Sequence, residues 1–248
     1  MDQRFSLRGK AAVVVGGAGY LCSALSRAML ESEMKVAILD VVKEPPADLS
    51  GEVFFLQCDA AQKEALLKGR EAVLQKFGRV DVLLNGATCN APTPFLEISE
   101  PEIDRILRAN VYATLYGCQV FGEAMVKQRK GSIINFASAS STTPLSRAFV
   151  YSAAKAGVLN LTKNLAREWA PYQVRVNALQ PGFFPTEWSR KHFIDEERQA
   201  KILGHTPMRR FGKPEELTGA VLWLASEAAS FVTGSVVTID GGFTAMTI

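Results

Sequence analysis

Residues 13–25 read VVVGGAGYLCSAL, an apolar run that passes through glycines into a pattern typical of a helix. A strand, a glycine turn and a helix in this order are typical of a loop that binds the phosphates of a dinucleotide. Gly16 permits the tight turn, and Gly19 lets the backbone approach a pyrophosphate. The third glycine of such a loop allows close packing of helix on strand, and Cys22 stands in its place.

Cys22 has two interpretations. A cysteine packs as a small apolar residue, but a thiol at a helix N-terminus can also have a lowered pKa and be reactive. Packing is favoured because no histidine or second cysteine lies nearby in the sequence. In both cases the backbone N–H groups at the helix start can hold an anion. Tyr20 and Leu21 therefore join Gly16 and Gly19 as predicted cofactor-binding residues.

The next strand, VAILD, ends in Asp40, 24 residues after Gly16. A carboxylate at this point can accept hydrogen bonds from both ribose hydroxyls and would repel a 2′-phosphate. We therefore expect NAD(H) as the cofactor, with NADP(H) disfavoured. The alternative is that Asp40 only caps a turn.

Short β-rich runs alternate with helical patterns along the chain. The runs are KAAVVV, KVAIL, EVFFLQ, VDVLL, GSIINF, QVRVNAL and SVVTID. One helical face is marked by Ala154, Val158, Leu161, Leu165 and Trp169, at spacings of three and four. Such alternation predicts an α/β fold with a doubly wound parallel sheet of about seven strands and helices on both faces, the Rossmann arrangement. We interpret residues 1–248 as a single dinucleotide-binding domain.

Composition disfavours several classes of protein. The net charge of +3 is small and evenly spread, so nucleic acid is not expected as the main ligand. Four scattered cysteines without a CxxC pair, and an N-terminus without an apolar signal segment, favour the cytoplasm. No apolar run is long enough for a bilayer, so no membrane partner is expected. With two histidines and no clustered ligands, no metal site is predicted.

The strongest chemical signal is SIINFASAS followed by YSAAK. Tyr151 and Lys155 are four residues apart, so on a helix they share a face. A free tyrosine has a pKa near 10, and burial raises it further. The Lys155 ammonium and an oxidised nicotinamide would favour phenolate, so that Tyr151 could exchange a proton with a carbonyl oxygen. Ser138, at a strand end, could hydrogen-bond the same oxygen.

These residues resemble the short-chain dehydrogenase/reductase family, and the resemblance covers nearly the whole chain. The family's catalytic Asn, Ser, Tyr and Lys match Asn110, Ser138, Tyr151 and Lys155. The resemblance implies that Asn110 distorts its helix and helps to hold a water that relays protons through Lys155. It also implies that Lys155 binds the nicotinamide ribose, and that the last strand, in FVTGSVVTIDGG, lies at a subunit interface of a homotetramer.

The same resemblance extends the predicted cofactor site. Asp59 looks like the residue that contacts adenine, Asn85 begins the segment that steadies the central strand, and Thr186 is the hydrogen-bonding residue of the nicotinamide-side loop. The predicted cofactor contacts on these segments are Asp59, Ala60, Asn85, Gly86, Pro181, Gly182, Phe184 and Thr186, besides Tyr151 and Lys155.

The chain departs from the family pattern at two places. The family's N-N-A-G segment reads Asn85-Gly86-Ala87-Thr88, and the glycine fingerprint has Val15 for its initial Thr and Cys22 for its last Gly. None of these changes removes a group that does chemistry. We expect them to alter local packing around the cofactor.

Residues 183–215 form a predicted lid of short, charged, helical pieces beyond a strand's carboxyl end, where a substrate would bind. Its surplus of Lys and Arg would suit an anionic substrate, although a solvated surface explains each residue equally well. GGAGYLCSAL and KILGHTPMRRFGKPEEL resemble a subgroup of mannonate or fructuronate oxidoreductases, relatives of gluconate 5-dehydrogenase. This implies a keto group on a sugar acid. The predicted substrate-binding residues are Asn90, Ser140, Arg147 and Trp188.

Three alternatives stay open at this point. The substrate could be a neutral sugar or a hydrophobic ketone. The chain could bind nucleotide without turnover, but the complete set of four catalytic residues disfavours this. An epimerase or dehydratase of the family's longer branch would carry an additional substrate domain, for which 248 residues leave no room.

Overall fold

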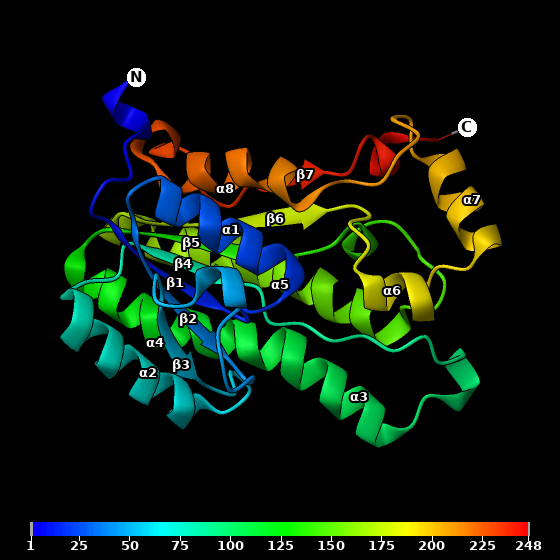
Figure 1. The fold of residues 1–248 in the computed structure, drawn as a ribbon, viewed down its shortest axis with the longest axis horizontal. Helices are drawn as coiled ribbons and strands as arrows, with labels where there is room; N and C mark the ends of the chain where they lie inside the picture. The colour runs from blue at the N-terminus through cyan, green and yellow to red at the C-terminus, as the bar shows by residue number, and fades with distance from the viewer. Residues whose placement is uncertain (1, 248) are drawn as a thin grey trace.

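The computed structural model describes residues 2–247, apart from the side chains of Glu187, Trp188 and His192. Seven strands form one parallel sheet in the order β3-β2-β1-β4-β5-β6-β7 (Figure 1). The strands are β1 (Ala11–Val15), β2 (Lys35–Asp40), β3 (Phe54–Gln57), β4 (Val82–Asn85), β5 (Gly131–Phe136), β6 (Val174–Pro181) and β7 (Val236–Ile239). The predicted single-domain, doubly wound fold is confirmed.

Helices cover both faces of the sheet (Figure 1). α1 (Tyr20–Glu31) and α8 (Thr218–Ala225) pack on one face, and α2 (Lys63–Phe77), α4 (Ala113–Gln128) and α5 (Phe149–Trp169) pack on the other. Strand side chains alternate between faces, so Ala12 and Val14 of β1 join the first core cluster while Val13 and Val15 join the second. Burial on both faces explains why this strand is apolar throughout.

The predicted lid contains two helices. α6 (Glu187–His192) and α7 (Glu196–His205) follow the carboxyl end of β6 and lie together at one side of the molecule (Figure 1). Two caps start them: Thr186 Oγ1 accepts a hydrogen bond from Ser189 N, and Asp195 Oδ1 accepts one from Arg198 N. The expected short helical pieces are therefore present.

Two strand boundaries differ from the sequence prediction. β4 begins at Val82 and not at Val80, because the backbone N–H and carbonyl of Val80 bond to the Gln128 side chain (3.1 and 2.8 Å) and not to a strand. The Asp81 carboxylate accepts a hydrogen bond from Ala11 N (2.9 Å) and pairs with Arg79. β6 continues through Pro181, where it still pairs with β7. This extension carries the chain further toward the carboxyl edge of the sheet, where the lid begins.

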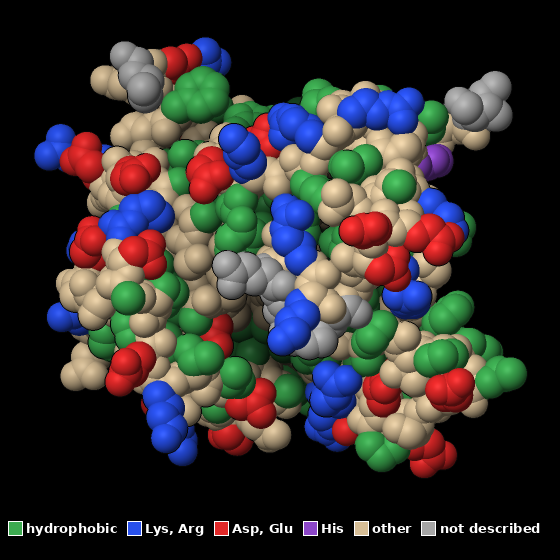
Figure 2. Space-filling view, turned by 45° about the vertical axis from the view of Figure 1, so that its right-hand side comes forward, with side chains coloured by type: hydrophobic (Ala, Val, Ile, Leu, Met, Phe, Trp, Pro, Cys, Tyr) green, Lys and Arg blue, Asp and Glu red, His purple; other side chains and the backbone are tan. Residues whose placement is uncertain are grey.

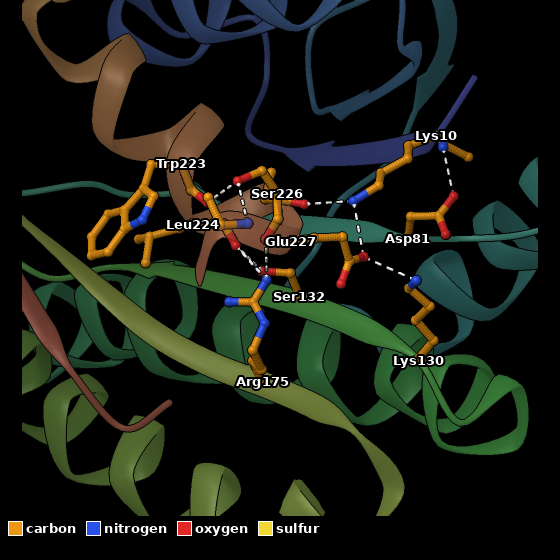
Figure 3. Close-up of polar contacts among 12 residues, drawn as sticks. Lys10, Asp81, Lys130, Ser132, Arg175, Trp223, Leu224, Ser226 and Glu227 are labelled. Carbon is orange, nitrogen blue, oxygen red and sulfur yellow. Dashed lines mark hydrogen bonds and ion pairs between the residues drawn. The ribbon is translucent and has the colours of Figure 1, made fainter. Parts of the chain in front are cut away.

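A polar cluster at the opposite, amino-terminal edge of the sheet holds the end of α8 (Figure 3). Arg175 donates to the Leu224 carbonyl (2.6 Å), Ser132 Oγ donates to the same carbonyl (2.8 Å), and Lys10 Nζ donates to the Ala225 carbonyl (3.0 Å). The last carbonyls of a helix have no partner within the helix, and cations there complement its dipole. The cluster thus fixes α8, which packs beside α1.

Among the residues that the structure describes, no helix combines the length and apolar character needed to cross a membrane.

Candidate active site

The candidate active site lies at the carboxyl ends of the central strands. β1 and β4 are neighbours in the sheet, although β2 and β3 lie between them in sequence. The chain therefore leaves β1 and β4 in opposite directions and opens a crevice, which is where doubly wound folds bind ligands. Two cavities of about 230 and 680 Å³ meet here and share Gly16, Gly19, Gly86 and Thr88.

Gly16 is required by both conformation and space. Its φ of +72° lies in the left-handed region that favours glycine. A Cβ on Gly16 would also lie 2.5 Å from the backbone nitrogen of Ala87, in the loop after β4. This close approach of two loops forms the floor of the crevice.

Cys22 fills space in this floor. The side chain is buried, and burial raises the pKa of its thiol to about 12, so the thiolate needed for reactivity is disfavoured. A Cβ on Gly86 would collide with the Cys22 sulfur. The sulfur therefore occupies volume that the missing side chain at position 86 leaves free. The two departures from the family pattern compensate each other, and the packing interpretation of Cys22 is the one that the geometry supports.

The first turn of α1 and Asp40 flank the cavities. Gly19 is the N-cap of α1 and has no side chain that could accept from the first N–H groups of the helix. Tyr20 and Leu21 follow it and line the smaller cavity. The unpartnered N–H groups of this first turn fit a pyrophosphate. Asp40 lines the larger cavity and accepts hydrogen bonds from Ala18 N (2.9 Å) and, more weakly, Val42 N (3.3 Å). Asp40 thus caps a turn, and its carboxylate still has lone pairs for ribose hydroxyls.

Asp59 and Ala60, which the resemblance assigns to the adenine side, line the larger cavity. The Asp59 carboxylate is held in place because its Oδ1 accepts a hydrogen bond from Ala61 N (2.9 Å). Sequence reasoning missed other residues on this wall. They are Val41, Val42, Asp104, Arg105 and Arg108. The two valines follow Asp40 directly in the sequence, and this adjacency is a signal that the sequence offered. In the structure they are exposed although apolar. The other three come from α3 (Glu100–Leu107) and its C-cap, whose approach no local pattern reveals.

Asn110 lies in a π-helical turn, Arg108–Tyr112, between α3 and α4. Its Nδ2 donates to the Ile106 carbonyl (2.8 Å), four residues earlier, which in an α-helix would accept the Asn110 backbone N–H. Nδ2 also donates to the Cys89 carbonyl (2.8 Å), and Oδ1 accepts from Thr88 Oγ1 (2.7 Å). The helix distortion that the resemblance implied is present, and it fixes Asn110 against the loop after β4.

Ser138, Tyr151 and Lys155 come together at the smaller cavity. Tyr151 and Lys155 share one face of α5, with Nζ 5.7 Å from the centre of the tyrosine ring. Nζ also donates to the Phe136 carbonyl (2.8 Å), and burial lowers the pKa of Lys155 to about 8. Burial raises the pKa of Tyr151, while hydrogen bonds with Ser138 and Thr88 oppose that rise. In the protein alone the phenol is therefore protonated.

The nicotinamide-side residues Pro181, Gly182, Phe184 and Thr186 also line the smaller cavity. Asn85 does not line the described cavities. Its buried side chain faces β5 instead, where Nδ2 donates to Asn135 Oδ1 (2.9 Å). Asn85 thus supports the central strands, and the predicted cofactor contact does not follow from the orientation of its side chain.

A third cavity, of about 420 Å³, adjoins Ser138 and Tyr151 and lies under the lid. Of the predicted substrate-binding residues, Asn90, Ser140 and Arg147 line it, whereas the Trp188 side chain lies outside the described residues. Arg198 of α7 also lines it; the sequence offered it only as one of several lid cations. On the face turned toward the viewer in Figure 2, Lys and Arg side chains border a hollow.

Comparison with known proteins identifies the family. A short-chain dehydrogenase/reductase family model, described as Enoyl-(Acyl carrier protein) reductase, matches residues 19–244. The uncharacterized oxidoreductase UxuB of Bacillus subtilis (strain 168) is 38% identical over 97% of this chain and 96% of its own.

Two solved structures share the fold. One is a gluconate 5-dehydrogenase from Burkholderia cenocepacia J2315 in complex with NADP and tartrate, with a TM-score of 0.94, 28% identity and 99% of both chains covered. The other is a protein from Haemophilus influenza with bound NAD, to which D-mannonate oxidoreductase activity is ascribed. It has a TM-score of 0.90, 30% identity, and coverage of 98% of this chain and 97% of that one. The fold, the crevice and these similarities together establish that the chain belongs to the short-chain dehydrogenase/reductase family of oxidoreductases.

Proposed function

We propose that this protein is an NAD(H)-dependent oxidoreductase that interconverts a secondary alcohol and a ketone on a sugar acid, such as mannonate/fructuronate or gluconate. The observation that supports a sugar acid as the substrate is a pair of arginines on the wall of the cavity beside Tyr151. Arg147 comes from the segment before α5, and Arg198 comes from the lid. Two similar structures are named for gluconate and mannonate chemistry.

The arginine pair has the charge and the donors that a carboxylate needs. Arg198 is held by Ser146, to whose Oγ and carbonyl it donates (2.8 and 2.9 Å). Burial, and then the neighbouring Arg147 charge, lower the pKa of Arg198. Asp195 is 3.4 Å from Arg147 and is the counterion between them. One carboxylate for two guanidiniums leaves a positive charge, and guanidinium forks bind carboxylates in a bidentate way.

Proton transfer is assigned to Tyr151. When bound, the nicotinamide dinucleotide supplies or accepts the hydride. Tyr151 gives its proton to the carbonyl oxygen during reduction, or takes it from the alcohol during oxidation. Ser138 orients the same oxygen. Its Oγ accepts from Ser140 N (3.2 Å) and Ser140 Oγ (3.1 Å), so its own proton is free to donate. Lys155 supplies the cationic charge that favours phenolate.

Asp40 is the residue proposed to select NAD(H). A 2′-phosphate beside its carboxylate would bring two anions together in the crevice. The gluconate 5-dehydrogenase structure contains NADP and the Haemophilus structure contains NAD, so the fold accepts both dinucleotides. Asp40→Ala is expected to weaken NADH binding and to reduce discrimination against NADPH, whereas an unchanged preference would remove Asp40 from this role.

The substrate is tested by NADH oxidation with keto-sugar acids, neutral ketoses and hydrophobic ketones, with NADPH in parallel. We expect turnover of the acids with NADH. Arg198→Met should raise KM for the acids by about tenfold or more, as expected for loss of a charged hydrogen bond. The matched control is Lys201→Met, a lid cation paired with Glu197 that does not line the cavity.

Other outcomes select the alternatives. Turnover confined to neutral or apolar ketones would keep the oxidoreductase and reject the sugar acid. NADH binding without turnover of any carbonyl would favour a nucleotide-binding protein without catalysis.

We also propose that residues 183–215 act as the lid of a single catalytic domain, and that the protein works in the cytoplasm as a homotetramer. β7 ends the strand order of the sheet, so its outer edge is available for another subunit. Light scattering coupled to gel filtration tests the tetramer.

A further inference from the structure

Thr88 occupies the point where the three cavities of the candidate site meet. It follows β4, and it lines both cofactor-side cavities and the substrate cavity. In the family pattern this position is the glycine of N-N-A-G, so Thr88 adds a hydroxyl that the pattern lacks. The sequence alone predicts that this departure alters local packing around the cofactor. Its contacts give it a chemical role.

The Asn110 amide determines where the Thr88 proton points. Both Nδ2 protons are used, by the carbonyls of Cys89 and Ile106. The amide oxygen can therefore only accept, and its partner is Thr88 Oγ1 at 2.7 Å. The single Thr88 proton points at Asn110, and the lone pairs of Oγ1 remain for the hydroxyl of Tyr151, which lines two of the same cavities. Thr88 lowers the pKa of Tyr151 as a hydrogen-bond partner of its charged form.

The other side of Tyr151 has the same polarity. Ser138 Oγ accepts two hydrogen bonds from Ser140, so its own proton is free to donate: to the Tyr151 hydroxyl in the protein alone, and to the substrate oxygen when substrate is bound. Before substrate binds, the hydrogen bonds therefore run in one direction, from Ser140 through Ser138, Tyr151 and Thr88 to Asn110. Such chains polarise their members.

We propose that Thr88 is a positioning residue that holds the Tyr151 hydroxyl and, when Tyr151 becomes anionic, turns its proton from Asn110 to the tyrosine oxygen. The proposal rests on the proposed function, since it assumes that Tyr151 exchanges a proton with the substrate. No covalent bond of Thr88 forms or breaks: rotation about its C–O bond exchanges a neutral acceptor for a charged one. A hydrogen bond to an anion is about twice as strong as a neutral one, so the exchange favours phenolate.

The groups that face Tyr151 are few among the described residues. Lys155 lies on the same helix, Ser138 follows β5, and Thr88 and Cys89 follow β4. Burial raises the pKa of the Cys89 thiol, and its negative charge, where it ionises, raises the pKa of Tyr151. Thr88 and Ser138 are thus the neutral donors available to the phenolate. Lys155 is the cation on the same helix, and Arg147 and Arg198 add positive charge from the wall of the adjoining cavity.

The test compares Thr88→Val, which keeps the shape without the hydroxyl, with Thr88→Ser, which keeps the hydroxyl. The readout that needs no substrate is the ultraviolet titration of Tyr151, taken as the difference between each protein and its Tyr151→Phe counterpart. We expect Thr88→Val to raise the Tyr151 pKa by about one unit and Thr88→Ser to restore it. Thr93→Val, which removes a hydroxyl bonded to Glu102 outside the site, is the control for threonine replacement.

The pH dependence of kcat supplies the second readout. In Thr88→Val the limb that reports Tyr151 should move in the same direction by the same amount, and the rate below that limb should fall about tenfold. Titration curves of wild type and Thr88→Val that superimpose would overturn the proposal. So would a Thr88→Ser protein that behaves like Thr88→Val. If no carbonyl is reduced by wild type, the proposed function fails while the ultraviolet titration still decides the role of Thr88.

Discussion

Gly86→Ala is the substitution that tests the compensation between Cys22 and the loop after β4. The added Cβ would collide with the Cys22 sulfur and would lie 3.3 Å from the Val15 carbonyl oxygen. Its distance to Cys22 Cβ, 3.8 Å, is an ordinary contact. The sulfur atom is therefore the main obstacle, and Cys22→Ala removes it while leaving a good helix former in α1.

The magnitudes follow from overpacking. Insertion of a methyl group into a packed site costs about 1–3 kcal/mol, against a gain of about 0.4–1 kcal/mol from a less flexible unfolded chain. We expect Gly86→Ala alone to lose about 1–2 kcal/mol, which for a chain of this size lowers Tm by roughly 3–6 °C. In the Cys22→Ala background the same substitution should cost less than about 0.5 kcal/mol, so that the two changes couple by about 1 kcal/mol or more.

The assay is a double-mutant cycle on Tm and on the free energy of unfolding, with NADH affinity measured for each of the four proteins. Cys22→Ala alone should keep NADH affinity and turnover, because the thiol only packs. Equal costs of Gly86→Ala in both backgrounds would refute the compensation. Loss of activity in Cys22→Ala would show that the thiol does more than fill space.

Three further predictions concern Tyr151, Lys155 and Arg175. Tyr151→Phe should lower kcat by about 10²–10⁴-fold, the usual contribution of a general acid, while NADH binding by fluorescence stays unchanged; near-normal turnover would remove Tyr151 from its role. Burial lowers the pKa of Lys155 from 10.5 to about 8, so between these values the unfolded chain binds more protons and stability due to this group rises with pH. Relative to Lys155→Met, the wild-type protein without cofactor should therefore gain stability as pH rises from 8 toward 10, and a difference independent of pH would contradict the assignment. Arg175→Leu should cost about 1–3 kcal/mol of unfolding free energy, because it removes a partner from the carbonyls at the end of α8; exposed Arg167→Leu is the control, and equal stability of the two variants would refute the role of the cluster.

The sequence predicts the elements that depend on local pattern. β1 is a buried strand because its five residues are all apolar, and α5 is a helix because its apolar residues recur at three and four. Neither prediction needs knowledge of a distant partner. The start of β4 does need one, because the backbone N–H and carbonyl of Val80 bond to the side chain of Gln128, 48 residues later, and not to a neighbouring strand. These residues meet only after the sheet has formed.

The candidate site divides in the same way. Gly16 and the pair Tyr151 and Lys155 follow from residue type and spacing within one segment. Arg198 cannot be distinguished from the other lid cations by sequence, because its place at the cavity depends on how α7 begins at Asp195 and on the contact with Ser146. The orientation of Asn85 toward β5 likewise depends on Asn135, fifty residues later.

The three unusual residues around the crevice differ in what they change. Cys22 and Gly86 exchange volume across one contact: a side chain is gained on α1 and one is absent from the facing loop. Such an exchange leaves the shape of the floor nearly unchanged and needs no chemical purpose. Thr88 has no counterpart of this kind, because its hydroxyl is used by Asn110 and Tyr151. A departure that restores volume is expected to be neutral for turnover, whereas one that adds a hydrogen-bond donor beside the proton-transfer residue is expected to move its pKa. The Cys22–Gly86 cycle and the Thr88 titration therefore measure two different physical quantities, packing free energy and phenolate stabilisation. Gly86 and Thr88 both lie in the loop after β4, and Cys22 lies on the helix that faces this loop.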